Sequence, residues 1–281
     1  LKNLEKSTDI DKIILLCSKM IHGALASARY THALCLTHKV LSLIPNASID
    51  PEEPNFNIYF FLMSLIHVEI LFNIGAMEDC IDIGYKVLNV ISDENIAKLK
   101  PDYMAEEQFK DMIVTCTGYV ALANVIQMKG NVGEFLNIIY TSLSFIPKSY
   151  DLILQLQELI AGREVIISQD MVGNDKFSAI VYHILNAFVN SKDTPEQFAE
   201  DVYQAKLAAR KNNLAQIEIF CDLLIGYTYV NLESYKKAAS IIYKIIKSVK
   251  NHGMYLLQHL GWYFLSEMNL RQKKFDVAYV M

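Results

Sequence analysis

The stretch FCDLLIGYTYVNLESYKKAASIIYKII, residues 220–246, predicts a pair of helices joined by a short turn. Its apolar residues recur at intervals of three and four on both sides of a polar turn, as expected of helices that each bury one face. Gly226 and Ala238 are small residues, one on each predicted helix, and small residues let two helices approach closely where they cross. We therefore expect two closely packed helices over 214–230 and 234–250.

Similar sets of residues return elsewhere in the chain. The segments 119–147 and 262–278 repeat this spacing well, and 30–45 repeats it less completely. Tyr235 and Phe275 are 40 residues apart, whereas the other segments are separated by different intervals, so we expect an irregular array. The positions that we assign to the repeat are Tyr119, Leu122, Ala123, Gly130, Ile225, Gly226, Tyr229, Tyr235, Ala238, Trp262, Ser266, Phe275 and Ala278.

These residues resemble the tetratricopeptide family, whose repeats are helix pairs of about 34 residues. The resemblance implies an all-α fold, a right-handed α-α superhelix (a TPR-like solenoid) of about six to seven helix pairs. It also implies that the first helix of each pair lines a concave groove that binds peptides or partner domains. The longer spacing in this chain is more similar to the repeats of large bacterial regulatory and assembly proteins. Flagellar-associated assembly proteins of spirochaetes are one comparison.

The length of 281 residues fits either two globular domains or one array of helix pairs, and the repeat signal favours the array. Only six prolines and eleven glycines are spread over the chain, so we expect no long linker. We predict one tetratricopeptide-like region over 1–281, with sub-blocks 1–147, 148–212 and 213–281. The chain begins at Leu1 and stops at Met281 inside a predicted second helix, so we expect a fragment of a longer protein.

Three other segments carry local predictions. The apolar run 58–74 is interrupted by His67 and Glu69 and is too short for a bilayer, so it predicts a buried helix. Thr194 is followed directly by Pro195, and Gln197 lies three residues after Thr194. These residue types predict a helix start that is capped by the threonine hydroxyl and closed by a capping box. The segment 149–168 predicts a helix without a partner in the repeat.

Composition excludes several classes of function. The net charge of −5 argues against binding to nucleic acid, which requires a dominant basic surface. The five cysteines are odd in number, far apart and set among apolar residues, so we interpret them as reduced core residues. Without an apolar run long enough to span a bilayer, we predict no direct membrane insertion. The location is predicted as cytoplasmic or left open, because the expected fragment lacks the native N-terminus.

No catalytic motif is present in the sequence. The chain has no metalloprotease HExxH, no phosphate-binding glycine loop, no CxxC pair and no nucleophile elbow. His252 and His259 are seven residues apart and share a helical face, but a zinc site requires three or four ligands and no third one is evident. We therefore predict a protein that is not an enzyme and holds no cofactor or metal.

The resemblance places a set of polar and aromatic side chains on the groove. First helices face the groove, and aromatic, amide and charged side chains there suit the recognition of an extended peptide. The alternative is that each side chain is solvated or packs against the next repeat. The predicted partner-binding residues are Tyr227, Asn231, Tyr263, Glu267, Arg271, Asn124 and Gln127.

The leading functional hypothesis is a non-enzymatic scaffold that binds another protein or peptide and helps to assemble a complex. An alternative is a ligand- or partner-sensing regulatory repeat domain of a large signalling ATPase. Charge is unevenly placed, with nine acidic and four basic residues over 78–111 and eight basic and one acidic over 236–274. Such a polarity suits an acidic partner or self-association between copies.

Overall fold

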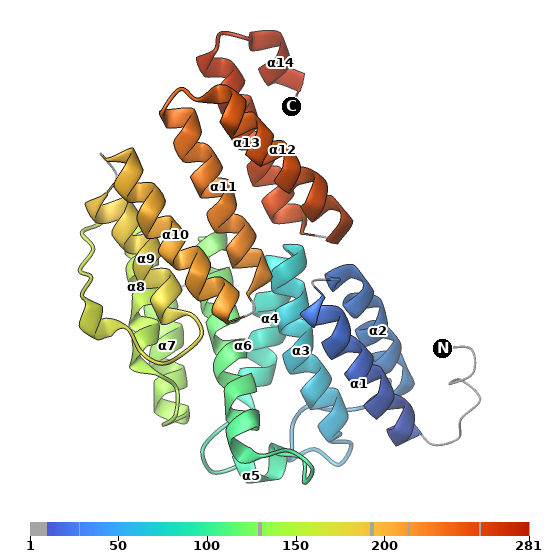
Figure 1. Cartoon of the computed structure of the whole chain (residues 1–281). Helices are drawn as coiled ribbons and strands as arrows, with labels where there is room; N and C mark the ends of the chain where they lie inside the picture. The colour runs from blue at the N-terminus through green and yellow to red at the C-terminus, as the bar shows by residue number, and fades with distance from the viewer. Residues whose placement is uncertain are drawn as a thin grey trace. The chain divides into compact units, whose positions relative to one another are not determined.

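The fold is all-α in the part of the chain that the structure, a computed structural model, describes: residues 10–27, 29–128, 131–191, 194–212, 214–252 and 254–280 (Figure 1). Regular structure there consists of fourteen α-helices and two short 3-10 helices, with one isolated bridge between Ser48 and Phe56. The helices of the first half are α1 (Ile10–Ala26), α2 (Tyr30–Leu43), α3 (Ile58–Ile74), α4 (Met77–Asn89), α5 (Ile96–Leu99), α6 (Glu106–Gln127) and α7 (Val132–Ser142). Those of the second half are η1 (Lys148–Tyr150), α8 (Asp151–Ile160), η2 (Gln169–Met171), α9 (Ser178–Asn190), α10 (Pro195–Lys211), α11 (Ala215–Asn231), α12 (Tyr235–His252), α13 (Tyr255–Arg271) and α14 (Phe275–Val280).

The chain forms two compact units, Leu1–Ile146 and Pro147–Met281. In both units consecutive helices pack against each other, as α1 does on α2, α3 on α4, α9 on α10 and α11 on α12. The predicted division at 212–213 falls inside the second unit, between two helices, α10 and α11, that pack together.

In the first unit, α3 is the buried helix that the apolar run predicts. The side chain of Asn57 accepts hydrogen bonds from the backbone N–H groups of Tyr59 and Phe60, which caps the start of the helix. Gly75 ends it with a φ of 88°, a conformation that glycine adopts without steric cost. The next helix, α4, approaches α6 at Gly84, where a Cβ atom would overlap the side chain of Val120. The predicted buried helix is confirmed.

The last two helix pairs follow one plan with an offset of 40 residues. The first helices, α11 and α13, begin at Ala215 and Tyr255, and the second helices, α12 and α14, begin at Tyr235 and Phe275. The turns inside the two pairs also correspond. Glu233 and Lys273 both take a positive φ, of 55° and 59°. The residue after each donates its N–H to a carbonyl five residues back at 2.9 Å, as in a Schellman helix end.

Small residues lie at the helix crossings of the second unit. A Cβ atom on Gly226 would lie 3.0 Å from Cγ1 of Ile242 on α12, so this glycine meets the second helix of its own pair. Ala238 is buried on that second helix. In the last pair, the hydroxyl of Ser266 donates a hydrogen bond of 2.8 Å to the carbonyl of Ala278, which joins α13 to α14.

The other repeat positions vary in burial. Tyr119, Leu122 and Ala123 are buried in α6, whereas Ile225, Tyr229, Tyr235 and Trp262 are half-buried. Phe275 is 63% exposed and so does not occupy a buried position, because α14 covers only the side of α13 that carries Ser266. Gly130 lies outside the described residues.

The segment 149–168 differs from its prediction. Helix α8 ends at Ile160, and Gly162 then takes a φ of 69°, which turns the chain out of the helix. The irregular chain that follows is fixed at Asp175. Its carboxylate accepts hydrogen bonds from the N–H groups of Phe177 and Ser178 and from the hydroxyl of Ser149. The first two bonds satisfy N–H groups at the start of α9, and the third ties that start to Ser149 at the beginning of the segment. Apolar periodicity does not detect such side-chain bonds.

The start of α10 confirms one part of the cap prediction and contradicts another. Pro195 occupies the first turn, as predicted, but the hydroxyl of Thr194 makes no cap bond and instead donates to the carbonyl of Ser191 at 3.3 Å. Ser191 in turn donates its own hydroxyl to the buried carboxylate of Asp201 at 2.6 Å. The connection between α9 and α10 is therefore held by side-chain bonds to the helices rather than by a capping box.

Burial of the cysteines and of α6 is relevant to two predictions made from composition, namely that the cysteines lie in the core and that no segment inserts into a membrane. Four of the five cysteines are buried, all five are unpaired, and Cys35 is exposed, contrary to expectation. Burial raises the pKa of the Cys80 and Cys221 thiols to about 12. Among the described helices, α6 alone is long and apolar enough to span a membrane, and 72% of its apolar window is buried inside the fold.

Candidate functional site

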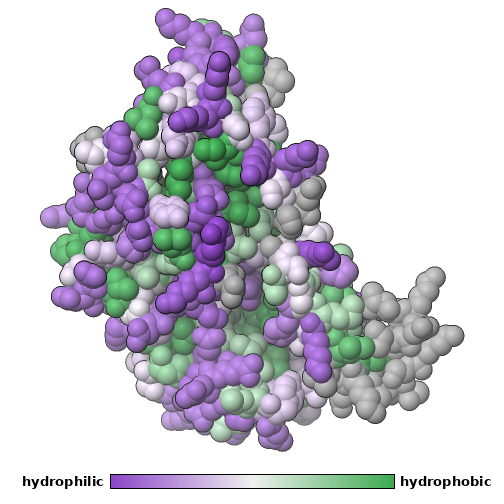
Figure 2. Space-filling model, viewed as in Figure 1, coloured by the Kyte–Doolittle hydropathy of each residue, from purple (hydrophilic) through white to green (hydrophobic). Residues whose placement is uncertain are grey.

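An aromatic pocket of about 310 Å³ lies on four helices of the second unit. This volume is at the small end of the range for ligand pockets, roughly 300–1,000 Å³. In Figure 2, hydrophobic side chains gather between hydrophilic ones over the C-terminal helices. Helices α9, α10, α11 and α13 supply its nine lining residues, which are Phe188, Pro195, Phe198, Leu224, Tyr227, Thr228, Asn231, Tyr263 and Phe264.

Helical spacing explains why α11 supplies four of these residues. Leu224, Tyr227, Thr228 and Asn231 are spaced by three, one and three residues, so they form one stripe along the helix. The hydroxyl of Thr228 donates to the carbonyl of Leu224 within the same helix at 3.0 Å. The stripe therefore presents a leucine, an aromatic ring and, at its end, an amide.

Aromatic rings line the pocket in contacting groups. The rings of Tyr227 and Phe264 stack with centroids 4.5 Å apart and an interplanar angle of 26°, and Tyr263 lies 5.9 Å from Phe264. On the side of α9 and α10, Phe188 and Phe198 meet edge to face at 5.1 Å. Such pairs fix one another's orientation, so the pocket has stiff, flat walls.

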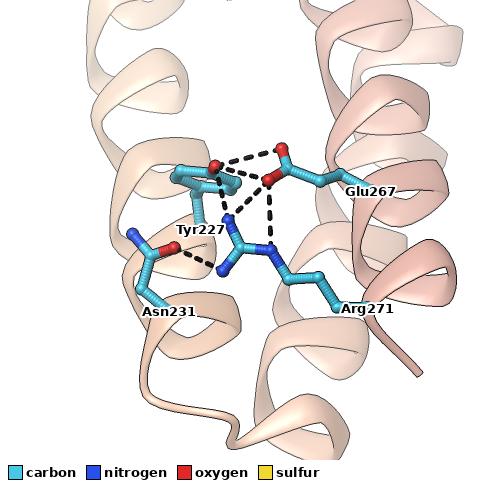
Figure 3. Close-up of polar contacts among 4 residues, drawn as sticks. All are labelled: Tyr227, Asn231, Glu267 and Arg271. Carbon is cyan, nitrogen blue, oxygen red and sulfur yellow. Dashed lines mark hydrogen bonds and ion pairs between the residues drawn. The ribbon is translucent and has the colours of Figure 1, made fainter. Parts of the chain in front are cut away.

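Behind the pocket, four polar side chains join α11 to α13 (Figure 3). The Tyr227 hydroxyl lies 2.9 and 3.0 Å from the two carboxylate oxygens of Glu267. The guanidinium of Arg271 donates to Glu267 from Nε at 3.1 Å and from Nη2 at 2.5 Å. It also donates to Oδ1 of Asn231 at 2.8 Å and to the Tyr227 hydroxyl at 3.2 Å.

The network links equivalent positions of consecutive repeats. Tyr227 and Glu267 are 40 residues apart, and so are Asn231 and Arg271. This interval equals the offset between α11 and α13. The polar side chains therefore hold the two first helices in register, and the aromatic pocket depends on that register.

Arg271 also determines which groups the pocket presents. A guanidinium carries only donors, so Asn231 must direct its carbonyl oxygen to Arg271, and its NH₂ group is left to face elsewhere. Burial, followed by the Glu267 carboxylate, raises the pKa of the Tyr227 hydroxyl, which stays protonated and donates to Glu267. The Glu267 charge is paired with Arg271, and neither residue lines the pocket.

The structure thus divides the predicted partner-binding residues into three groups. Tyr227, Asn231 and Tyr263 line the pocket, and Tyr263 is 61% exposed. Glu267 and Arg271 lie behind it and orient the first two.

The third group lies in α6 of the other unit. Asn124 is 2% exposed and bonds to the carbonyl of Val120 and the hydroxyl of Tyr85, so its predicted exposure is wrong. At Asn124, α6 is covered by neighbouring helices, and the spacing of residues along α6 alone does not show this. Gln127 is half-buried at the end of the same helix.

Sequence reasoning missed Phe188, Pro195, Phe198 and Phe264. Phe264 follows Tyr263 directly, and the stripe that contains Glu267 also passes through it at a spacing of three. Phe188 and Phe198 belong to two different helices, and only the packing of α9 on α10 brings them together. The sequence signal for these two was their apolar character close to a predicted helix end.

Two further predictions concern the types of side chain that lie together, namely that no metal is bound and that no reaction is catalysed. Among the described residues, no group of three or more histidine, cysteine or acidic side chains is placed to hold a metal ion. His259 is exposed, and the side chain of His252 lies outside the described part. The pocket itself is lined without a carboxylate, histidine, cysteine or lysine.

No known protein family matches the chain, and no curated protein or solved structure matches it either.

Proposed function

We propose that this chain is a non-enzymatic scaffold that binds a segment of a partner protein in the aromatic pocket on α9, α10, α11 and α13. The proposal includes a tetratricopeptide-like right-handed superhelix, in which the first helices of the pairs, here α9, α11 and α13, line the inner surface. Two features support the repeat assignment. The last two pairs correspond residue by residue at an offset of 40, and small residues lie where their helices cross.

One observation carries the proposal. Tyr227, Asn231 and Tyr263, selected from the sequence as groove residues, come from two helices and line the same pocket. Rigid aromatic walls with a few polar groups at the edge are typical of sites that anchor side chains of a partner. Because the pocket is lined without a carboxylate, histidine, cysteine or lysine, binding explains its composition better than catalysis.

The test is capture of partner proteins from native cell extract with the wild-type chain as bait, identified by mass spectrometry. Tyr263→Ala removes a lining ring that is 61% exposed, so the fold is expected to survive. Tyr255→Ala is the matched control, because Tyr255 is 51% exposed on the same helix but lies outside the pocket. We expect a partner that the wild type and the control recover and Tyr263→Ala loses.

Tyr263→Ala is a cleaner probe than a change at Tyr227 or Arg271. Tyr227 stacks on Phe264, and Arg271 contacts three other side chains, so changes there would also loosen α11 from α13. Recovery of the same proteins by all three baits, or of none by the wild type, would refute binding in this pocket.

A further inference from the structure

Resting on the proposed function, we propose that the segment bound in the aromatic pocket is proline-rich and adopts the polyproline II conformation. The inference follows from three properties of the pocket, namely its charge, the shape of its walls and the hydrogen-bonding groups at its edge.

The pocket is uncharged. None of its nine lining residues carries a charge, and the nearest carboxylate of the network, that of Glu267, is paired with Arg271 at 2.5 Å. A lysine, arginine or acidic side chain that entered the pocket would lose hydration without meeting a side chain of opposite charge among the lining residues. The bound segment is therefore apolar where it enters.

The walls suit flat, cyclic side chains. Phe188 and Phe198 meet edge to face on one side, and Tyr227 stacks on Phe264 on the other. Grooves lined by aromatic rings are the common receptors for polyproline II segments, whose preformed helix loses little conformational entropy on binding. A pocket of about 310 Å³ suits a short stretch of such residues.

The edge of the pocket presents donors. Arg271 occupies Oδ1 of Asn231, so the amide NH₂ group is what Asn231 offers to a ligand. Tyr263 contributes an exposed phenol hydroxyl from α13. Two acceptors nearby, the Asn231 oxygen and the Glu267 carboxylate, are already engaged by Arg271.

This pattern discriminates between backbone conformations of the ligand. A proline-rich segment has carbonyl oxygens to accept these bonds and few N–H groups to satisfy. A β-strand would bring N–H groups as well, and because Arg271 already binds the Asn231 oxygen and the Glu267 carboxylate, only hydroxyl oxygens would be left to accept from them. An α-helix would leave the donors of Asn231 and Tyr263 buried without a partner, because its own carbonyls are already bonded.

The test uses fluorescein-labelled decaproline and fluorescence anisotropy with the whole chain. An alanine-based peptide of about 20 residues, long enough to be helical in water and carrying the same label, is the comparison ligand. We expect saturable binding of decaproline and no saturable binding of the helical peptide. Absence of saturable decaproline binding would overturn the proposal.

Two variants locate the binding. Tyr263→Ala removes a ring and should weaken decaproline binding about three- to tenfold. Asn231→Asp keeps an oxygen for Arg271 but removes the NH₂ donors, and we expect about a threefold to tenfold loss as well. Tyr255→Ala should bind as the wild type does. Equal binding by all four proteins would place decaproline elsewhere and overturn the proposal.

The extract experiment separates this inference from the proposed function. If Tyr263→Ala loses a cellular partner but the wild type fails to bind decaproline, the scaffold stands and the proline-rich ligand is refuted. Saturable binding of the helical peptide in the pocket would likewise refute it in favour of helix recognition. If neither the partner nor decaproline depends on Tyr263, both proposals fail.

Discussion

Substituting glycine by alanine at three helical positions tests how closely the helices cross. The change adds one methyl group at each site and gains about 1 kcal/mol of helix propensity in a helix interior. Gly23 in α1 has no neighbouring atom within 4 Å of the position that a Cβ atom would take. Gly23→Ala should therefore keep most of this gain and stabilise the chain by about 0.5–1 kcal/mol.

At the two crossings the methyl group meets a neighbouring helix. On Gly226 it would lie 3.0 Å from Cγ1 of Ile242, so a shift of a few tenths of an ångström is needed and the change in stability should be near zero. On Gly261 it would lie 2.6 Å from Cγ1 of Ile246. Overpacking costs about 1–3 kcal/mol, so Gly261→Ala should destabilise by about 1 kcal/mol after the propensity gain.

The assay is thermal and denaturant unfolding followed by far-ultraviolet circular dichroism. About 1 kcal/mol corresponds to roughly 2–4 °C in the midpoint for a unit of this size. Stability should fall in the order Gly23→Ala, Gly226→Ala, Gly261→Ala, and Gly226→Leu should cost about 1–3 kcal/mol because it adds three further carbon atoms to the same contact. An alanine at Gly261 that is as stable as one at Gly226, or an unchanged Gly226→Leu, would refute the close crossing.

Three more predictions concern single side chains. Burial, and then the nearby His38, lowers the pKa of His67 to about 4, so the folded state favours the neutral ring. The free energy of unfolding should fall as pH drops from about 6.5 to 4, by at most about 3 kcal/mol, and a pH series should show a weaker dependence for His67→Leu. Glu233 has a φ of 55°, so Glu233→Gly should raise the midpoint of unfolding by relieving about 1 kcal/mol of backbone strain, and a lower midpoint would contradict the turn geometry. Asp201 accepts a buried bond of 2.6 Å from Ser191, so Asp201→Ala should cost about 1–3 kcal/mol in denaturant unfolding, and Asp201→Asn, which keeps an acceptor, should cost less.

The sequence predicts those parts of the fold that depend on local periodicity. The helices around Gly226 and Ala238 and the buried α3 with its stop at Gly75 follow from spacing and from the one residue that tolerates a positive φ. The close contact at Gly261 is not predicted by the sequence. This glycine makes the tighter of the two approaches, yet its neighbours are Ile246 of the preceding pair and Leu223, and spacing within one pair does not identify contacts between pairs.

Segments fixed by side-chain bonds are less predictable. Helix α8 ends at Ile160, and the next helix, α9, starts where the Asp175 carboxylate accepts bonds from two N–H groups and from Ser149, 26 residues earlier. Thr194 has the residue type of a helix cap, yet its hydroxyl bonds back to Ser191. In both cases a long-range or backward bond competes with a local rule, and only the folded chain shows which one is formed.

The same holds for the candidate site. The sequence predicts some of the residues that belong to it but not what each residue does there. Helical spacing selects Arg271 as a residue on the inner face, and an exposed arginine there would be expected to contact a partner. In the folded chain it finds acceptors on Tyr227, Asn231 and Glu267, all within its own unit. In the proposed site its effect on a ligand is indirect, because it binds Oδ1 of Asn231, which lines the pocket, and does not line the pocket itself. A surface selective for carbonyl-rich, N–H-poor segments can therefore arise from an arginine that never touches the ligand.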